Sequence, residues 1–258
     1  RQFLGIHTVD DIPDEKTVWN VRNKLSQSGT FDVLFSKFRT FLDAKGLSFN
    51  EGKIIDATFV EAPKQRNSRE ENKQIKEGNG KELWKDAPHK KCHKDTDARW
   101  TKKRGEPHYG YKNHTKCDAK TKLIETYHTT DASVHDSKVV TPLLEDKDKG
   151  QNLYLDAGYE GQKDVVEEHG MTPIICEKGH RNHPLTEEQK KGNRKKSKTR
   201  CRIEHIFGFI EGAMHGSLVR SIGMVRAAAN TALTCLTYNV FRYVQICKYQ
   251  PQLISVKG

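Results

Sequence analysis

The segment KIIDATFV (residues 53–60) is typical of a β-strand, and it carries an acidic residue in its middle. β-Branched and aromatic side chains favour extended backbone, and a short apolar run is typical of a strand buried in a sheet. Asp56 interrupts this run, and a buried carboxylate costs free energy unless it is paired or binds a cation. Because the strand continues after Asp56, a functional role is favoured over a turn-capping role.

The segment NLYLD (residues 152–156) repeats this pattern and ends on Asp156. Asp156 precedes Ala157 and Gly158, so a turn-capping role is a serious alternative there. Three more strands are predicted at 108–118, 123–130 and 172–176, and helices at 13–45, 134–144, 162–169, 198–215 and 225–247. This order predicts an α/β fold with a mixed five-stranded sheet flanked by helices. The first three strands are expected to be antiparallel, and the later two to enter through helical crossovers.

The helix expected at 198–215 carries a third acidic candidate, Glu204. At 100° per residue, Ile203 and Ile206 face the core, and Glu204 lies at the border between core and surface. The alternative is an ordinary ion pair with Arg200 four residues earlier. Together, two strand carboxylates and one helix carboxylate suit hard divalent cations such as Mg²⁺ or Mn²⁺. A pair of such ions supports in-line phosphoryl substitution.

The charge of the chain is concentrated in two segments. The 258 residues carry a formal net charge of +11. Residues 64–105 contribute +7, residues 181–200 contribute +6, and the rest of the chain sums to −2. Such blocks indicate a polyanion partner such as nucleic acid, and solvated loops without a partner are the alternative. Six scattered cysteines without a CxxC pair suggest a reduced, cytoplasmic setting. No apolar run reaches the length of a membrane span, so no membrane partner is expected.

Six collinear blocks of the sequence are similar to one known family. They are Pro13–Trp19, Ile54–Thr58, Asp97–Lys112, Val134–Ser137, Leu155–Tyr159 and Arg200–Gly208. They resemble, in order, the conserved segments of bacterial insertion-sequence transposases with a DDE catalytic triad, of the insertion-sequence-five type. The resemblance covers nearly the whole chain.

The resemblance implies a ribonuclease-H-like fold that cleaves DNA at insertion-sequence ends and transfers the strand to target DNA. It implies that Asp56, Asp156 and Glu204 form the catalytic triad and bind two Mg²⁺ or Mn²⁺ ions. Residues 1–50 are then a truncated helical N-terminal segment, and residues 51–250 are the catalytic domain with a basic insertion at 64–105. The expected partner is double-stranded DNA, both transposon ends and target, bound by a homodimer in the bacterial cytoplasm and nucleoid.

Five residues are expected to contact DNA. Arg200 matches the arginine of the family signature around the catalytic glutamate, and the other four are Lys112, His135, His205 and Tyr159. The chain departs from that signature at Ser197, where relatives have Tyr, and at Glu211, where they have Lys. An anion at position 211 motivates one alternative, a catalytically inactive DNA-binding remnant. A second alternative is a ribonuclease-H-like nuclease without strand transfer.

Overall fold

The computed structural model describes residues 5–47, 50–103, 105–181 and 183–254. Its centre is a six-stranded mixed sheet in the order β2-β3-β1-β5-β6, with β4 paired to the outer side of β3. The strands are β1 (Lys53–Glu61), β2 (Arg99–Lys103), β3 (Glu106–Asp118), β4 (Ile124–Asp131), β5 (Asn152–Leu155) and β6 (Thr172–Ile175). The sheet is consistent with the ribonuclease-H-like fold of DDE transposases.

The strand directions agree with the prediction from sequence. The meander β1-β3-β4 is antiparallel, and β5 and β6 run parallel to β1. The number of strands was wrong by one, because β2 pairs with the first residues of β3. Gly110 lies at this junction with φ +143°, where a Cβ atom would meet the Val60 carbonyl oxygen at 2.4 Å. Only glycine allows β3 to cross so close to the end of β1.

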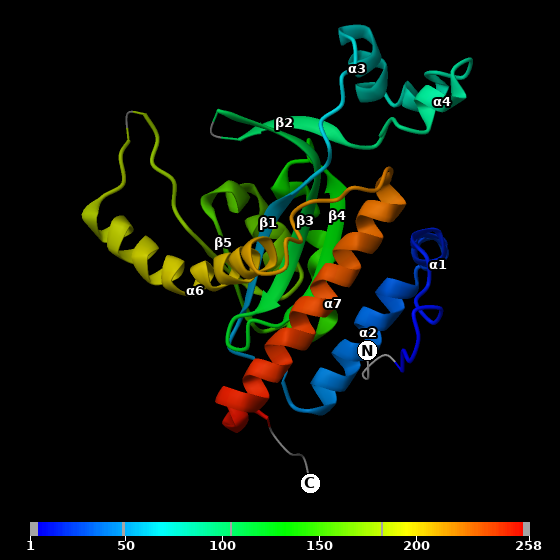
Figure 1. Cartoon of the computed structure of the whole chain (residues 1–258). Coiled ribbons are helices and arrows are strands. Elements are labelled where there is room, and N and C mark those ends of the chain that lie inside the picture. The colour runs from blue at the N-terminus through cyan, green and yellow to red at the C-terminus, as the bar shows by residue number, and fades with distance from the viewer. Residues whose placement is uncertain (1–4, 48–49, 104, 182, 255–258) are drawn as a thin grey trace.

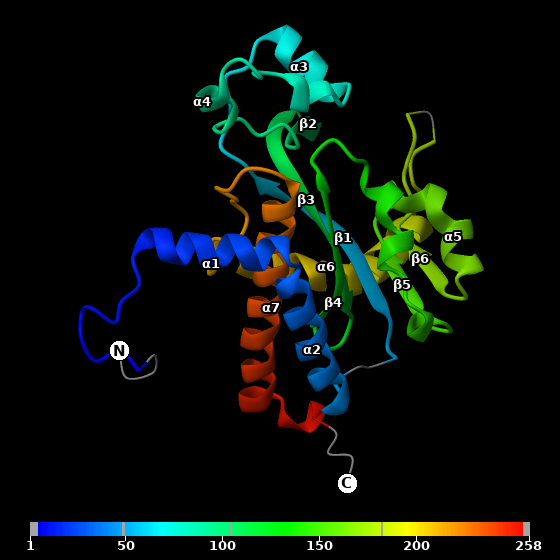
Figure 2. The ribbon, with the colours of Figure 1, turned by 90° about the vertical axis from the view of Figure 1, so that its right-hand side faces the viewer.

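Helices cover both faces of the sheet (Figures 1 and 2). The longer helices are α1 (Glu15–Gln27), α2 (Thr30–Ala44), α6 (Glu187–Gly212) and α7 (Met224–Tyr249); the shorter ones are α3 (Arg69–Lys76), α4 (Pro88–Lys91) and α5 (Lys163–Glu168). The 3₁₀ turns are η2 (Asn79–Glu82), η3 (Asp136–Val139), η4 (Thr141–Leu143), η5 (Asp146–Asp148), η6 (Ala157–Gln162) and η7 (Pro251–Leu253). None of the helices in the described ranges is long and apolar enough to cross a bilayer.

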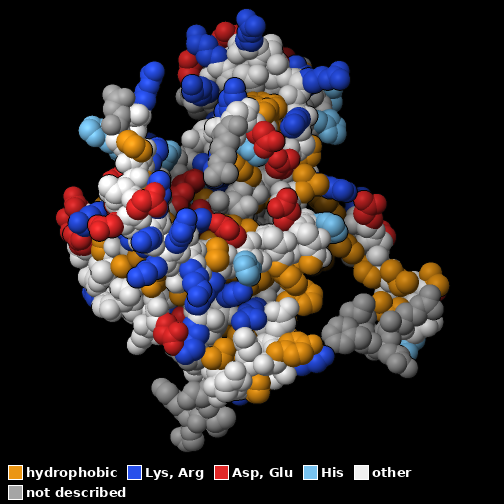
Figure 3. Space-filling view, turned by 90° about the vertical axis from the view of Figure 1, so that its left-hand side faces the viewer, with side chains coloured by type: hydrophobic (Ala, Val, Ile, Leu, Met, Phe, Trp, Pro, Cys, Tyr) orange, Lys and Arg blue, Asp and Glu red, His pale blue; other side chains and the backbone are white. Residues whose placement is uncertain are grey.

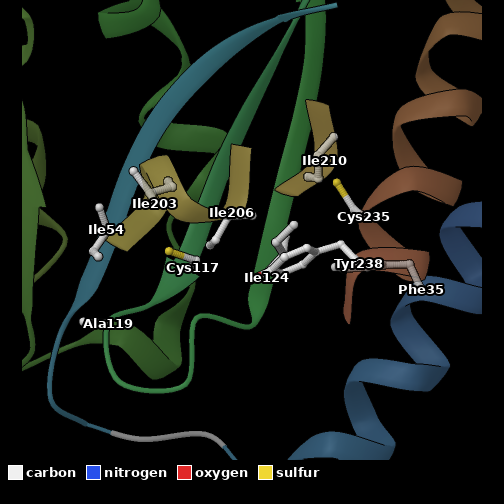
Figure 4. Close-up of a cluster of buried hydrophobic side chains, with 10 residues drawn as sticks. All are labelled: Phe35, Ile54, Cys117, Ala119, Ile124, Ile203, Ile206, Ile210, Cys235 and Tyr238. Carbon is white, nitrogen blue, oxygen red and sulfur yellow. The ribbon is translucent and has the colours of Figure 1, made fainter. Parts of the chain in front are cut away.

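The alternation of side chains along β1 builds two cores. Ile54 packs with three isoleucines of α6, with Cys117, and with Cys235 and Tyr238 of α7 (Figure 4). Ile55 points the other way and packs with Leu153 and Leu155 against η4 and α5. Successive residues of a strand face opposite sides, so Asp56 lies on the same side as Ile54, facing α6.

Three helix predictions were wrong in detail. The helix expected over 13–45 is two helices, because Gly29 adopts a left-handed conformation between α1 and α2. The helix expected over 134–144 is a pair of 3₁₀ turns, since Pro142 lacks an N–H and disfavours helical backbone at the residue before it. Helix α6 begins eleven residues earlier than predicted, at a capping box between Thr186 and Gln189.

The segment 64–105 is not simply extended, as the sequence suggested. It forms α3, η2, α4 and β2, and it protrudes beyond the end of the sheet (Figures 1 and 2). Helix α3 begins with a capping box in which Ser68 and Glu71 bond reciprocally to each other's backbone N–H. Its one buried residue is Ile75, so the helix has too little apolar periodicity to be recognised.

Candidate active site

Asp56 lies in the middle of β1 and faces α6. Its Oδ1 accepts a hydrogen bond from the Ala57 N–H, and its Oδ2 accepts one from Arg200 at 2.9 Å. The side chain is 16% exposed. Burial raises the pKa of Asp56 to about 6, although the Ala57 N–H and the Arg200 charge act to lower it and the nearby Asp156 raises it further. Its carboxylate therefore lies in a site that favours additional positive charge.

Asp156 directly follows β5 and is the N-cap of η6. Its Oδ1 accepts a hydrogen bond from the Gly158 N–H at 2.8 Å, so the turn-capping interpretation from sequence is correct. Capping does not exclude a second role, because a carboxylate offers several acceptor positions. Asp156 is close enough to Asp56 and Arg200 to act on the pKa of both. The parallel pairing of Ile54 with Tyr154 leads to the two aspartates, two residues further along each of these neighbouring strands.

Glu204 enters the same site from α6. Arg200 Nη2 donates to Glu204 Oε1 at 2.7 Å, while Nη1 of the same guanidinium donates to Asp56 Oδ2. The ion pair that was the alternative interpretation of Glu204 is therefore present, and it also bridges to Asp56. We call Asp56, Asp156, Glu204 and Arg200 the site cluster. Contacts therefore join Asp56, Arg200 and Glu204, and Asp156 acts on Asp56 and Arg200 through its charge.

The donor set of the site cluster suits hard divalent cations. It offers three carboxylates and one arginine, with no thiol or imidazole among these four side chains. Carboxylate oxygens are the ligands that Mg²⁺ and Mn²⁺ prefer. Both oxygens of Asp56 already accept hydrogen bonds, and one of them comes from Arg200. A cation bound at Asp56 Oδ2 would therefore replace the Arg200 contact.

Lys112 lies on the other face of the sheet. Lys112 pairs across the strands with Phe59, which is three residues from Asp56 in β1. Because side chains alternate along a strand, Phe59 and Lys112 point away from the face that carries Asp56. Its Nζ donates to Asp136 at 2.8 Å and to the Val134 carbonyl at 2.7 Å. The expected contact between Lys112 and DNA is not supported, because its charge is already neutralised by Asp136.

The three remaining predicted DNA contacts differ in exposure: Tyr159 is buried, and His135 and His205 are exposed. Tyr159 is only 2% exposed and packs in the core, so the expectation that it contacts DNA is not supported. Burial, and after it the charge of Asp56, raises the pKa of its hydroxyl. His135 is exposed and caps η3 by accepting from the Ser137 N–H. His205 is exposed on α6, and its Nδ1 lies 3.2 Å from Lys122 Nζ. Both histidines are accessible to a ligand.

Lys103 is a cation near the site that the sequence analysis did not single out. Its charge acts on Asp56 and lowers the pKa of that carboxyl, opposing the effect of burial. Its Nζ lies 5.5 Å from the centre of the Phe59 ring, and His108 stacks on the same ring at 4.0 Å. The only signal in the sequence was the basic composition of residues 99–103, which gave no reason to single out one lysine.

A second group of carboxylates lies elsewhere on the sheet. Atoms of Glu125, Glu145 and Asp148 come within 4.8 Å of one another, as ligands of one ion would. However, Lys116 Nζ lies between them, bonded to Asp148, 2.7 Å from Glu145 and 3.9 Å from Glu125. We call these four residues the buried cluster. The lysine ammonium already provides the positive charge that a metal would supply.

The face of the molecule on which α6 lies carries a mixed charge pattern. Figure 3 shows acidic side chains grouped near the middle of this face and Lys and Arg side chains gathered beside them. The N-terminal half of α6 is rich in cations, namely Lys190, Lys191, Arg194, Lys195, Lys196, Lys198 and Arg200. A strand of negative charge laid across the acids would therefore meet positive charge on either side.

Comparison with known proteins agrees with this arrangement. Residues 47–240 match the model of the family described as "Transposase DDE domain". The chain is 34% identical over 227 residues to the transposase for insertion sequence element IS1106 of Neisseria meningitidis serogroup B. That match covers 86% of this chain and 75% of the relative. No solved structure matches the chain significantly.

Proposed function

The chain belongs to the family of transposases with a DDE domain, and from this premise we propose that the site cluster is its catalytic centre. Asp56, Asp156 and Glu204 would hold two Mg²⁺ or Mn²⁺ ions. When bound, these ions activate an attacking oxygen and stabilise the leaving oxygen of a phosphodiester. The reaction is cleavage at insertion-sequence ends followed by strand transfer into target DNA.

The residues of the chain position the reacting groups. β1 and the turn after β5 fix Asp56 and Asp156, because β5 pairs in parallel with β1. Glu204 lies on α6, whose isoleucines pack against the same sheet. Packed strands and a packed helix fix the backbone that carries these carboxylates, which would lower the cost of assembling the site for the reaction.

We propose that Arg200 changes its partners when DNA binds, from the two carboxylates to a phosphate. In the free protein its guanidinium neutralises Asp56 and Glu204. When DNA enters, the planar fork of the arginine suits a phosphate oxygen pair equally well. Arg200 then holds the backbone beside the reacting bond, and the carboxylates become available to cations. This exchange couples the loading of the site to the binding of DNA.

The rest of the chain supplies DNA contacts and assembly. We propose residues 51–250 as the catalytic domain, with the insertion 64–105 and the basic half of α6 holding phosphates. We propose residues 1–50 as a helical N-terminal segment, of which α1 and α2 pack on α7. Two ends must be joined for transposition, so we expect a homodimer on DNA, acting in the bacterial cytoplasm and nucleoid.

The observation that carries this proposal is the Arg200 guanidinium, which joins Asp56 of β1 to Glu204 of α6, with Asp156 at the end of the neighbouring strand β5. The test is a reaction of the protein with a plasmid carrying both ends of its insertion sequence, with and without Mg²⁺. We expect cuts at the ends that require the metal, and joining of pre-cleaved ends to target DNA.

Two results would contradict the proposal. Cutting without joining would identify a nuclease that lacks strand transfer. Binding of DNA with no cutting in Mg²⁺ or Mn²⁺ would identify an inactive remnant, the alternative raised by the anion at Glu211. The matched control is Asp136→Asn, which removes a carboxylate that is paired with Lys112 outside the site cluster.

A further inference from the structure

Four basic side chains converge where the turn between β3 and β4 meets α6 and α7. Lys122 lies in the turn, Arg202 and His205 lie on α6, and Arg242 lies on α7. We call these four residues the turn cluster. Lys122 Nζ lies 3.2 Å from His205 Nδ1. The charges of Arg242 and Arg202, together with burial as the larger cause, lower the pKa of Lys122. The turn cluster therefore concentrates positive charge on partly buried groups.

These cations have no acidic partner among the residues that the structure describes. Arg202 donates to the Ala119 carbonyl, and Arg242 donates to the Thr121 carbonyl and to the side chains of two glutamines. By contrast, the buried Lys53 and Lys116 pair with carboxylates. Cations brought together without an anion raise the energy of the folded protein, unless a ligand provides the missing negative charge.

A small hollow lies over the turn cluster. It has a volume of about 100 Å³ and is lined by Lys122, His205, Arg242, Gln245 and three aromatic residues, Phe209, Tyr238 and Phe241. Phe209 contacts the other two rings edge-on, at 5.9 Å and 5.8 Å between centroids. Phe241 is 50% exposed, so the rings form an apolar floor that is open to solvent. A charge bound against such a floor is less screened by water.

The turn cluster and the site cluster lie at the same level of α6, on different flanks of the helix. His205 is the residue after Glu204, so their Cα atoms are about 3.8 Å apart. Arg202 lies between Arg200 and Glu204 in the sequence and projects from a different side of the helix. A DNA strand carries one phosphate per about 3.4 Å of helix axis, so several phosphates pass within reach of this part of α6.

We propose that the turn cluster is a binding site for a DNA backbone phosphate next to the cleaved position. The ligand is a phosphodiester of the strand held at the site cluster, with its sugar against the Phe209 and Phe241 rings. The inference rests on the proposed DNA-binding function but not on its chemistry. The proposal assigns a role to Lys122, Arg202 and Arg242. These residues belong neither to the triad nor to the two basic segments.

The test measures DNA affinity against salt in the absence of divalent metal. Lys122→Asn removes the charge at a residue whose φ of +61° asparagine tolerates, and it leaves the carbonyl contacts of both arginines in place. We expect the affinity for a random-sequence duplex to fall about threefold to tenfold. The slope of log K against log[salt] should become shallower by about 0.9, the value for one phosphate.

Lys37→Asn is the matched control, because Lys37 is exposed on α2, on the far side of α7 from α6 (Figure 1). It should leave the salt slope unchanged. Lys122→Gly provides a second variant compatible with the positive φ, and thermal unfolding confirms that each variant is folded. Because metal is absent, a result here does not depend on whether the protein cleaves DNA.

Three outcomes would overturn the inference. The first is an unchanged salt slope in both Lys122 variants, provided that the wild-type protein binds DNA. The second is a change in oligomeric state without a change in slope, which would make the turn cluster a protein interface. The third is a rise in melting temperature when millimolar inorganic phosphate is added without DNA, seen in the wild-type protein and not in the Lys122 variants. This result would identify a site for a free anion.

Discussion

The two carboxylate clusters of this molecule contain the same chemical groups in different surroundings. In the buried cluster, Lys116 is fully buried and cannot leave its three acids without unfolding the sheet. In the site cluster, Arg200 is anchored on α6 with its side chain 19% exposed, and Glu204 is 54% exposed. A carboxylate cluster with a fixed cation stabilises a fold, whereas one with an exchangeable cation can accept a ligand.

The neighbours of the two cations explain this difference. Lys116 lies in β3, between two paired strands, and its Nζ contacts acids from β4 and the loop that follows. Lys53 adds a second buried cation, 2.8 Å from Glu125 and 3.2 Å from Asp118. The site cluster instead lies at the edge of α6, where water and DNA reach one side. Proximity of acids alone therefore does not identify a metal site.

The largest expected effect is the loss of Lys116. Lys116→Met should destabilise the protein by about 3–5 kcal/mol, because it leaves the fully buried Asp148 without its counter-charge. The measurement is urea unfolding followed by circular dichroism. Arg200→Met is the comparison, and it should cost less than Lys116→Met, because Arg200 is 19% exposed and one of its two partners, Glu204, is 54% exposed. Equal losses would remove the distinction between the clusters.

The next effect is on catalysis. Asp156→Asn should reduce the rate of metal-dependent cleavage by about 10²–10³-fold, the loss typical when one group that stabilises the transition state is removed. The rate per folded molecule should be unchanged in Glu145→Gln. Single-turnover cleavage at saturating protein separates these effects from binding. A catalytically normal Asp156→Asn protein would show that the site cluster is not the catalytic centre.

A smaller effect on the stability of the protein is expected when the pH is lowered. Burial acts to raise the pKa of Glu145, but hydrogen bonds and charges from Arg39 and Lys116 outweigh it and hold the pKa at about 2. The ordinary value is 4.5, so the stabilisation from this carboxylate is complete above pH 4.5 and is lost as the pH falls toward 2. Glu145→Gln should be less stable than wild type at pH 7 and approach it near pH 2. Urea unfolding across this range measures the difference, and a constant gap would contradict the assignment.

The acids of the site cluster were predictable because their signals are local. Asp56 and Asp156 interrupt or end apolar strands, and Glu204 borders an apolar helix face, so each stands out within a few residues of sequence. The central role of Arg200 was only partly predictable. Its i,i+4 pair with Glu204 follows from helix geometry, but its contact with Asp56 depends on how α6 packs on the sheet.

The buried cluster and the helices inside the insertion were not predicted, for a related reason. Lys53 and Lys116 were charges within expected strands, but their acids come from distant segments, and no local pattern joins them. In the insertion, short polar helices are defined by capping boxes and by Trp84 bonded to Glu71, which apolar periodicity does not detect. Strand direction was predictable, because apolar strand patterns and connection lengths restrict topology strongly.

The most direct test of the central claim is to map where a divalent cation binds. Fe²⁺ that occupies a Mg²⁺ site generates hydroxyl radicals that cut the nearby backbone, and the fragments can be sequenced. With DNA bound, we expect Mg²⁺-competed cuts near residues 56, 156 and 204, and none of these in the triple variant Asp56→Asn, Asp156→Asn, Glu204→Gln. Cuts near residues 125, 145 and 148 instead, or cuts that persist in the triple variant, would contradict the account.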